Sequence, residues 1–583
     1  MNNQDSINAT KKIIFGLIVF GGLLAMKPVF AEELIRTFRA AISLDRAGNL
    51  QVVETIDYDF GATARHGILR EIPFGYQTGR GNYGLRLSNI FVSGEDGKRI
   101  PFSQGRTAGT LKLKIGDENQ AVSGLNRYLI SYRVGRAINF FDNRDELYWN
   151  VTGNGWPVAI ESVAATVSFP ASFDLAELST ACFAGLSGSR VSCNNILFPD
   201  LAEVKSTGKV AQVEFRQNGL AAGEGLSVVV GLPKGLINQP TSLTAVKDFL
   251  LDNYYVILPL FALVIMFYLW RTRGRDPEGR KVIIAQYDAP DKLTPAEVGT
   301  IIDEQADSLD ISAEIIHLAV LGYLKISQVK ASGLFSNSDD YLLSKLKDQA
   351  DLRQDFDRYL MTAIFKGKTE VMLSELKKTF YKDLAKIRAM IYDAVTLNGY
   401  FISNPDRVRR FFQVIAGLIM VFTTFFYKSL GYPNAAGLSL TAVIVALFGW
   451  RMPARTIKGV VAREQILGLK EYLRVAEKDR LDFTDAPDKN PAVFEKLLPY
   501  AIALKVEKEW AAQFAGIYEN NNPGWYDSYG HTAFNALILT DSLKSFTAKT
   551  NAVLGASAAG HQSGFGGGGF SGGGFGGGGG GSW

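Results

Sequence analysis

The densest group of chemically versatile side chains lies in segment 65–73. Here the imidazole of His66 stands between the guanidinium groups of Arg65 and Arg70, and the carboxylate of Glu71 follows directly. Imidazole titrates near neutral pH, so His66 is a candidate general base. A structural interpretation competes with this one, because arginine–carboxylate ion pairs also hold a loop in one conformation. The spacing shows no nucleophile paired with His66, and we therefore favour the structural interpretation.

A second segment, 141–157, combines carboxylates with two indole rings. Its carboxylates offer the oxygen ligands that calcium prefers, but their spacing is not that of an EF-hand loop. Ion pairs would explain them more simply, and the two tryptophans are suited to a packed core. We predict no metal and no cofactor here, and keep an enzyme site formed by both segments as the alternative. The residues in question are Asp142, Asp145, Glu146, Trp149 and Trp156.

The chain has two cysteines, Cys182 and Cys193. Gly185 and Gly188 lie between them, so the two ends can meet across a hairpin. In an oxidising compartment a disulfide is the default expectation for such a pair, and closing so short a loop contributes about 3 kcal/mol. A catalytic or metal-binding cysteine pair is the alternative.

Residues 32–250, which include both dense segments and both cysteines, have the sequence pattern of β-strands. Apolar and polar side chains alternate in short runs such as 51–58, 125–132 and 163–169, which are bounded by Gly, Asn and Asp. Alternation with a period of two places every second side chain in a core. We therefore predict an all-β, sandwich-like domain.

Four apolar stretches indicate a multi-pass membrane protein. The first lies within residues 1–31 and ends at a small-residue site typical of signal-peptide cleavage, with an uncleaved N-terminal helix as the alternative. The other three are long enough to span a bilayer and contain no charged residue, which favours anchoring over a transport path. They predict transmembrane helices at 254–270, 411–427 and 434–450.

The orientation follows from the basic residues at the ends of these spans. Cytoplasmic ends are enriched in Lys and Arg. Basic residues cluster at one end of each span: Arg271, Arg273 and Arg275; Arg407, Arg409 and Arg410; Arg451, Arg455 and Lys458. We therefore predict a plasma-membrane protein with residues 32–250 outside, and with 271–410 and 451–583 in the cytoplasm.

The cytoplasmic regions 271–410 and 451–545 are predicted to be mainly helical. Thr294 is a plausible N-cap, a second helix follows at 312–321, and a hairpin comes next, an order typical of a winged-helix unit. The second helix carries no Lys or Arg, and the whole chain has a net charge of only +4. Both observations weigh against nucleic acid and favour a protein-interaction module.

Residues 546–583 form a glycine-rich tail. In its last 20 residues 14 are Gly, and Phe recurs every five residues before the chain ends in Ser582-Trp583. Such a segment buries too little to offset the entropy of ordering, so we predict disorder. Its aromatic side chains leave two interpretations open, an inert tail or a flexible one that contacts a partner or neighbouring copies.

Several motifs together resemble the YciQ-like family of bacterial predicted membrane proteins. The resemblance covers nearly the whole chain, because the motifs occur in the same order along it. It implies an outside domain of unknown function, membrane helices, a cytoplasmic region and a glycine-rich end, and it implies no activity. The motifs are 65–73, 146–150, 274–277, 451–456 and 494–501.

The sequence therefore predicts architecture more fully than function. Two cysteines and four histidines exclude a zinc ribbon or an iron–sulfur ferredoxin, and 47% apolar residues exclude a fully disordered chain. Our main hypothesis is a non-enzymatic sensor, scaffold or envelope-assembly factor that couples the outside β domain to cytoplasmic modules, with the bilayer and proteins as partners. The alternatives are an envelope enzyme using His66 and 142–146, and a multimeric transporter or pore.

Overall fold

A computed structural model describes residues 33–107, 109–329, 340–378, 380–475, 490–514, 523–527, 536–554 and 575–583. The predicted signal peptide lies outside these residues. The chain divides into two compact units, which we call the β unit and the helical unit. The β unit comprises Met1–Val256, Tyr427–Asn434 and Phe565–Trp583, and the helical unit comprises Ile257–Phe426 and Ala435–Gly564.

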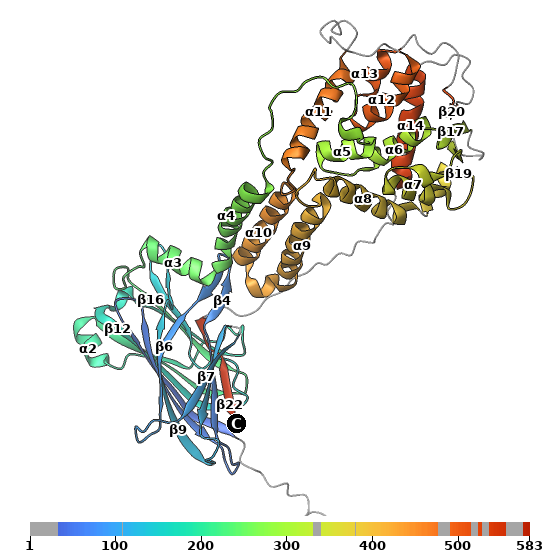
Figure 1. The fold of residues 1–583 in the computed structure, drawn as a ribbon. Helices are drawn as coiled ribbons and strands as arrows, with labels where there is room; N and C mark the ends of the chain where they lie inside the picture. The colour runs from blue at the N-terminus through green and yellow to red at the C-terminus, as the bar shows by residue number, and fades with distance from the viewer. Residues whose placement is uncertain are drawn as a thin grey trace, which may run out of the picture. The chain divides into compact units, whose positions relative to one another are not determined.

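The β unit contains the predicted sheet-rich domain (Figure 1). Its largest sheet has the order β14-β15-β12-β1-β2-β9-β6, in which β1 runs parallel to β12 and antiparallel to β2. Further sheets have the orders β10-β11-β16-β13, β22-β3-β8-β7 and β4-β5. The strands are β1 (Leu34–Leu44), β2 (Leu50–Asp59), β3 (Gly67–Pro73), β4 (Gly75–Thr78), β5 (Gly81–Gly84), β6 (Arg86–Ser93), β7 (Phe102–Thr107), β8 (Thr110–Gly116), β9 (Leu125–Gly135), β10 (Ile138–Phe140), β11 (Asp145–Asn150), β12 (Ile160–Asp174), β13 (Ser179–Gly185), β14 (Asn195–Leu197), β15 (Lys209–Leu220), β16 (Gly225–Leu232), β21 (Phe575–Gly576) and β22 (Gly579–Ser582).

One hydrophobic core unites these sheets. In β1 the side chains of Phe38, Ala40 and Ile42 are buried, whereas those between them face outward, as strand geometry requires. Trp149 and Trp156 are each only 1% exposed, so the prediction that both pack in the core is confirmed. Two short helices, α2 (Leu201–Thr207) and α3 (Ser242–Asp252), complete the unit.

The predicted disulfide is present between Cys182 on β13 and Cys193. The loop that it closes returns beside its own strand, where the Ala184 N–H donates to the Val191 carbonyl. The covalent bond therefore fixes a hairpin at the end of β13.

The prediction that residues 546–583 are disordered is wrong for both described ends of this segment. Helix α14 (Ala536–Leu554) runs into its first residues, and its last residues form β21 and β22. Figure 1 shows β22, in red, among the strands of the β unit. The reason is that glycine, which disfavours structure on its own, permits a very close approach to strands supplied by the rest of the unit.

Three described helices are long and apolar enough to cross a membrane: Tyr254–Gly274, Pro405–Leu430 and Tyr432–Trp450. The first comprises η2 (Tyr254–Ile257), α4 (Leu258–Leu269) and η3 (Trp270–Gly274), and the others are α9 and α10. Each contains one predicted span and extends beyond it by zero to six residues at either end. Within the helical unit they pack through a small cluster that includes Met266, Ala416 and Ala442.

The remainder of the helical unit surrounds its own hydrophobic core. A four-stranded sheet of order β19-β18-β17-β20 lies among the helices. The elements are η4 (Pro290–Lys292), α5 (Pro295–Asp303), α6 (Ser308–Val320), β17 (Leu324–Val329), β18 (Asp340–Lys345), η5 (Gln349–Asp351), α7 (Asp355–Phe365), β19 (Glu370–Met372), η6 (Leu373–Lys378), α8 (Phe380–Leu397), α11 (Ile457–Arg474), α12 (Pro491–Ala503), α13 (Glu507–Ala512) and β20 (Tyr526–Asp527). The predicted order of helix, helix and hairpin is therefore present as α5, α6 and β17–β18.

Buried carboxylates mark the junction of α5, α6 and α7. Glu297 closes the capping box that begins at Thr294, and Glu314 accepts a hydrogen bond of 2.9 Å from the Ala296 N–H. Burial raises the pKa of Glu314 to about 8 and raises the pKa of Asp357 well above its usual range. Burial therefore favours the uncharged form of both Glu314 and Asp357.

Candidate strand-binding site

The two dense sequence segments lie on either side of the tail. Segment 65–73 forms β3, which pairs with β22 in antiparallel register, Gly580 opposite Arg70 and Ser582 opposite Ile68. Segment 141–157 supplies β11 and the loop that follows it, and β11 pairs in parallel with β21. The tail is therefore inserted as an extended strand between these segments. We call the space that it fills the strand groove.

Backbone hydrogen bonds hold the tail along its whole described length. Beyond the two strand ladders, the Gly155 N–H donates to the Gly578 carbonyl at 2.8 Å. At the far end the His66 N–H donates to the Trp583 carbonyl at 2.6 Å, and the Trp583 N–H donates to the Gly67 carbonyl at 3.2 Å. This is recognition by strand addition, in which the main chain provides affinity and side-chain pockets provide specificity.

The groove admits only glycine at its narrowest points. A Cβ on Gly580 would overlap the Leu69 carbonyl oxygen and lie 2.5 Å from the ring of Trp156. A Cβ on Gly579 would overlap the backbone of Gly155. The receiving side is also close: a Cβ on Gly153 would overlap the Gly578 carbonyl oxygen, and one on Gly155 would lie 3.0 Å from the Gly579 Cα. The steric fit therefore selects a glycine-rich strand.

Trp583 occupies a separate pocket at the end of the groove. Its indole Nε1–H donates to the Ile115 carbonyl at 3.1 Å, and the Lys114 ammonium lies 3.7 Å from the indole ring centroid. The imidazole of His66 packs beside the same ring, with centroids 5.5 Å apart. The indole is thus held in this pocket by a hydrogen bond, a cation–π contact and ring packing.

A buried ion pair lies beneath the groove. Arg70 is 1% exposed and binds Glu54 through two hydrogen bonds, of 2.7 and 2.8 Å. Tyr132 also donates to Glu54, at 2.7 Å. The remaining nitrogen of Arg70, Nη1, donates to the carbonyls of Glu71 at 3.0 Å, of Thr152 at 3.3 Å and of the tail residue Gly577 at 3.4 Å. Burial alone would lower the pKa of Arg70, but Glu54 outweighs it, so the guanidinium stays charged.

A second carboxylate, Glu33, lies near the Trp583 end. It accepts hydrogen bonds from Arg65 at 2.7 Å and from Tyr58 at 3.0 Å, and it also bonds to the tail residue Ser582. Burial by itself would raise the pKa of Glu33, but the bonds from Ser582, Arg65 and Tyr58 lower it further than burial raises it. Glu33 therefore stays ionised and accepts a hydrogen bond from the Ser582 hydroxyl of the tail.

The acidic run lies elsewhere. Asp145 is fully buried and pairs with the Lys234 ammonium at 2.7 Å, Glu146 lies 3.6 Å from Arg144, and Asp142 is exposed. Among the described residues no contact joins His66 to this run, and no cluster has the ligands for a metal ion. The structure thus gathers Arg65, His66, Arg70, Glu71 and both tryptophans along the tail, and it leaves the acidic run outside.

Sequence reasoning missed the residues that complete the site. Glu54 and Tyr132 lie on β2 and β9, whose sequences are ordinary alternating segments, and Glu33 directly precedes β1. The one available signal was Glu54, a carboxylate that falls at an inward position of its strand. Gly153 and Gly155 lie within the second dense segment, but nothing in the sequence assigned them a role.

Likeness to solved structures is weak. An M1 zinc metallopeptidase from Deinococcus radiodurans is 13% identical, with 34% of this chain and 42% of that chain covered and a TM-score of 0.20. A putative protease from Parabacteroides distasonis is 11% identical, with 51% of each chain covered and a TM-score of 0.21. A cohesin from Archaeoglobus fulgidus is 17% identical, with 20% and 72% covered and a TM-score of 0.13. These scores are too low to carry any argument about function.

Sequence comparisons are more informative. The uncharacterized protein YciQ of Escherichia coli is 21% identical over an alignment of 439 positions, which covers 72% of this chain and 64% of that protein. Residues 34–232 match the family described as "Predicted membrane protein (DUF2207) N-terminal domain", and residues 282–514 match the corresponding C-terminal domain. The first match covers the strand groove and the second covers most of the helical unit. The chain therefore belongs to the YciQ-like family of predicted membrane proteins.

Proposed function

We propose that this membrane protein is a non-enzymatic receptor whose β unit binds an extended glycine-rich strand bearing a tryptophan. The observation that carries the proposal is the strand already seated in the groove, residues 575–583 of the chain itself. Its backbone is paired on both sides, its glycines fit where no side chain could, and its indole fills a pocket. Occupancy of the groove would be the signal or the assembly step that the protein passes to its helical unit.

A binding role explains the dense segments better than catalysis does. The ring of His66 packs against Trp583, and its backbone N–H holds the Trp583 carbonyl. Arg70 is occupied by Glu54 and by carbonyl groups. These side chains have the partners expected of a rigid recognition surface, and the acidic residues needed for the enzyme hypothesis contact none of them.

The membrane arrangement bears on which strand fills the groove. From the distribution of arginines we propose that the sheet-rich domain, residues 32–250, lies outside the membrane and that residues 451–554 lie in the cytoplasm. Between residue 250 and Leu554 the described residues contain three candidate spans, an odd number, so the chain's own tail reaches an outside groove only if the chain passes the bilayer again before Phe575. The 20 intervening residues can extend to about 70 Å, which exceeds the roughly 30 Å of hydrocarbon. A polar glycine backbone in hydrocarbon is nevertheless costly.

The receptor proposal is tested by adding the strand in trans. A chain ending at Leu554 is purified in detergent, where both of its faces are accessible. A synthetic peptide of residues 575–583, with a fluorophore at its Phe575 end, is titrated and its anisotropy is followed. We expect saturable binding that unlabelled peptide competes away and that Trp583→Ala in the peptide weakens strongly. Absence of saturable binding would refute the proposal.

The source of the strand in living cells is tested separately by a disulfide. Leu69 and Gly581 are register partners, and a Cβ on Gly581 meets only Pro157, at 3.6 and 4.0 Å. The full chain carrying Leu69→Cys and Gly581→Cys should form this bond if its own tail occupies the groove. If trans binding holds but the bond does not form, the natural ligand is a similar strand from another protein.

A further inference from the structure

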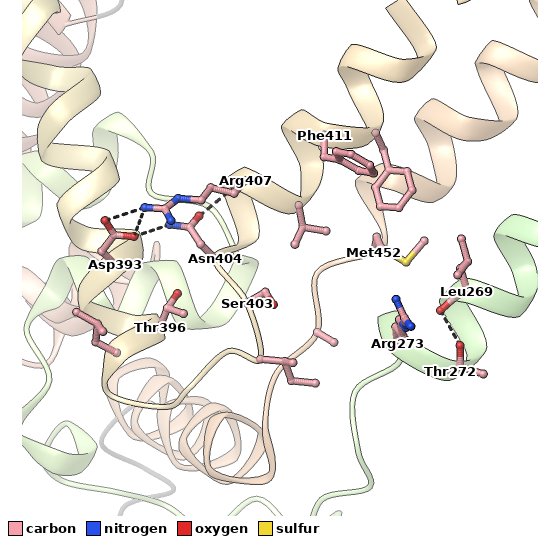
Figure 2. Close-up of a pocket in the computed structure, with 15 residues that line it drawn as sticks. Leu269, Thr272, Arg273, Asp393, Thr396, Ser403, Asn404, Arg407, Phe411 and Met452 are labelled. Carbon is pink, nitrogen blue, oxygen red and sulfur yellow. Dashed lines mark hydrogen bonds and ion pairs between the residues drawn. The ribbon is translucent and has the colours of Figure 1, made fainter.

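A cavity of about 1190 Å³ lies in the helical unit, near one end of the apolar helices. It is independent of the strand groove. Its walls come from the ends of α4 and α8, from η3, and from the first turns of α9 and the turn that leads into it (Figure 2). Met452 and Ala454, which follow α10, complete the lining. The cavity therefore lies where predicted spans meet the segments rich in arginine.

The lining has two chemical characters. Leu269, Phe411, Phe412 and Met452 offer an apolar surface that is continuous with the membrane-capable helices. Figure 2 shows Arg273 and Thr272 on this apolar side, and Asp393, Asn404 and Arg407 grouped across from them. An occupant must therefore present hydrocarbon and polar atoms together, which describes an amphiphile.

The two arginines of the cavity differ in whether a nearby carboxylate neutralises them. Arg407 lies 3.1 Å from Asp393, which also accepts a bond of 2.8 Å from the Asn404 amide, so this pair neutralises itself. Arg273 is exposed, and within the described part of the chain it forms no ion pair or hydrogen bond. The cavity thus offers one uncompensated positive charge beside apolar side chains.

We propose that this cavity binds a phospholipid with an anionic headgroup, its phosphate at Arg273 and the start of an acyl chain along Leu269, Phe411 and Met452. Basic pockets between membrane helices at the cytoplasmic side are suited to such headgroups. A free phosphate ion would satisfy the charge but would leave the apolar wall without a function. The lipid satisfies both.

Arg271 provides a matched control, because it lies two residues away on the same helical segment, is also exposed and does not line the cavity. The full-length protein is placed in nanodiscs of phosphatidylethanolamine and phosphatidylglycerol at equal proportions. Native mass spectrometry then counts the phosphatidylglycerol retained after release. We expect Arg273→Gln to lower retention about fivefold, the effect of one charge at a membrane surface, and Arg271→Gln to leave it unchanged.

A second variant tests the volume of the cavity without changing charge. Ser403→Trp at the rim should also lower retention, while circular dichroism verifies that the helices are intact. Equal loss in both arginine variants would mean unspecific attraction and would overturn the proposal. Equal retention of phosphatidylethanolamine, the uncharged lipid of the same nanodiscs, would overturn the anionic-lipid assignment, as would displacement of the lipid by millimolar inorganic phosphate alone.

Discussion

Two neighbouring glycines of the tail allow a sharp test of the strand groove. Gly580 and Gly581 have no positive φ, so alanine suits the backbone at both positions. They differ only in surrounding space. A Cβ on Gly580 would overlap the Leu69 carbonyl oxygen, whereas a Cβ on Gly581 would be in ordinary contact with Pro157. The same one-methyl change should therefore have opposite effects one residue apart.

The magnitude follows from the contacts. To relieve the overlap at Gly580 the strand must move by about 1 Å, which would break roughly two backbone hydrogen bonds of about 1 kcal/mol each and add an overpacking cost of about 1 kcal/mol or more. The total of about 3 kcal/mol corresponds to roughly 100-fold weaker binding. At Gly581 alanine reduces the freedom of the unbound peptide, which is worth about 0.4–1 kcal/mol in favour of binding.

The assay is the anisotropy titration of the 575–583 peptide against the chain that ends at Leu554, performed with each alanine peptide under identical conditions. Gly580→Ala should raise the dissociation constant about 100-fold, and Gly581→Ala should leave it unchanged or lower it by up to about fivefold. If the two peptides bind equally well, the strand does not lie in the register that pairs Gly580 with Arg70, and the steric argument fails.

Three further predictions concern stability. Glu54→Gln leaves the charge of Arg70 buried without its partner and should cost about 3 kcal/mol, seen as a lower unfolding temperature of the β unit. Because Glu314 has a pKa of about 8 when folded and near 4.5 otherwise, the folded chain holds a proton that the unfolded chain releases between these values. The unfolding temperature of the helical unit should fall as pH rises through that window, and less so in Glu314→Gln. Cys182→Ser combined with Cys193→Ser should cost about 3 kcal/mol, measured by chemical denaturation.

Local sequence patterns were sufficient to predict those elements whose structure depends on residues close to them in the sequence. Thr294 was recognisable as a cap, because the proline and glutamate of its capping box follow within three residues. The second helix was predicted at 312–321 but begins at Ser308, since Asp307 and Asp310 form a further capping box. Alternation sufficed for the strands, and the absence of charge sufficed for the apolar helices.

The tail could not be predicted in this way, because its structure depends on partners remote in sequence. Arg70 and Gly577 are 507 positions apart, and the glycines carry no periodicity of their own. His66, Arg70 and Trp156 could be found from the sequence because they lie in segments dense in charged and aromatic side chains. What these residues bind could not be found in this way. The complementary halves of the site, a glycine-lined groove and a glycine-rich strand, are recognisable only when both are seen together.

The position of β22 in its sheet has a consequence for the chain's solubility. With the tail in place, β3 has a neighbour on both sides; without it, β3 becomes an edge strand whose unpaired N–H and C=O groups run from Ile68 to Glu71. Exposed edges of this kind pair readily with other chains and initiate aggregation. Loss of the tail from the groove would therefore expose an edge that can pair with other copies of the chain, and the seated tail prevents this pairing at β3.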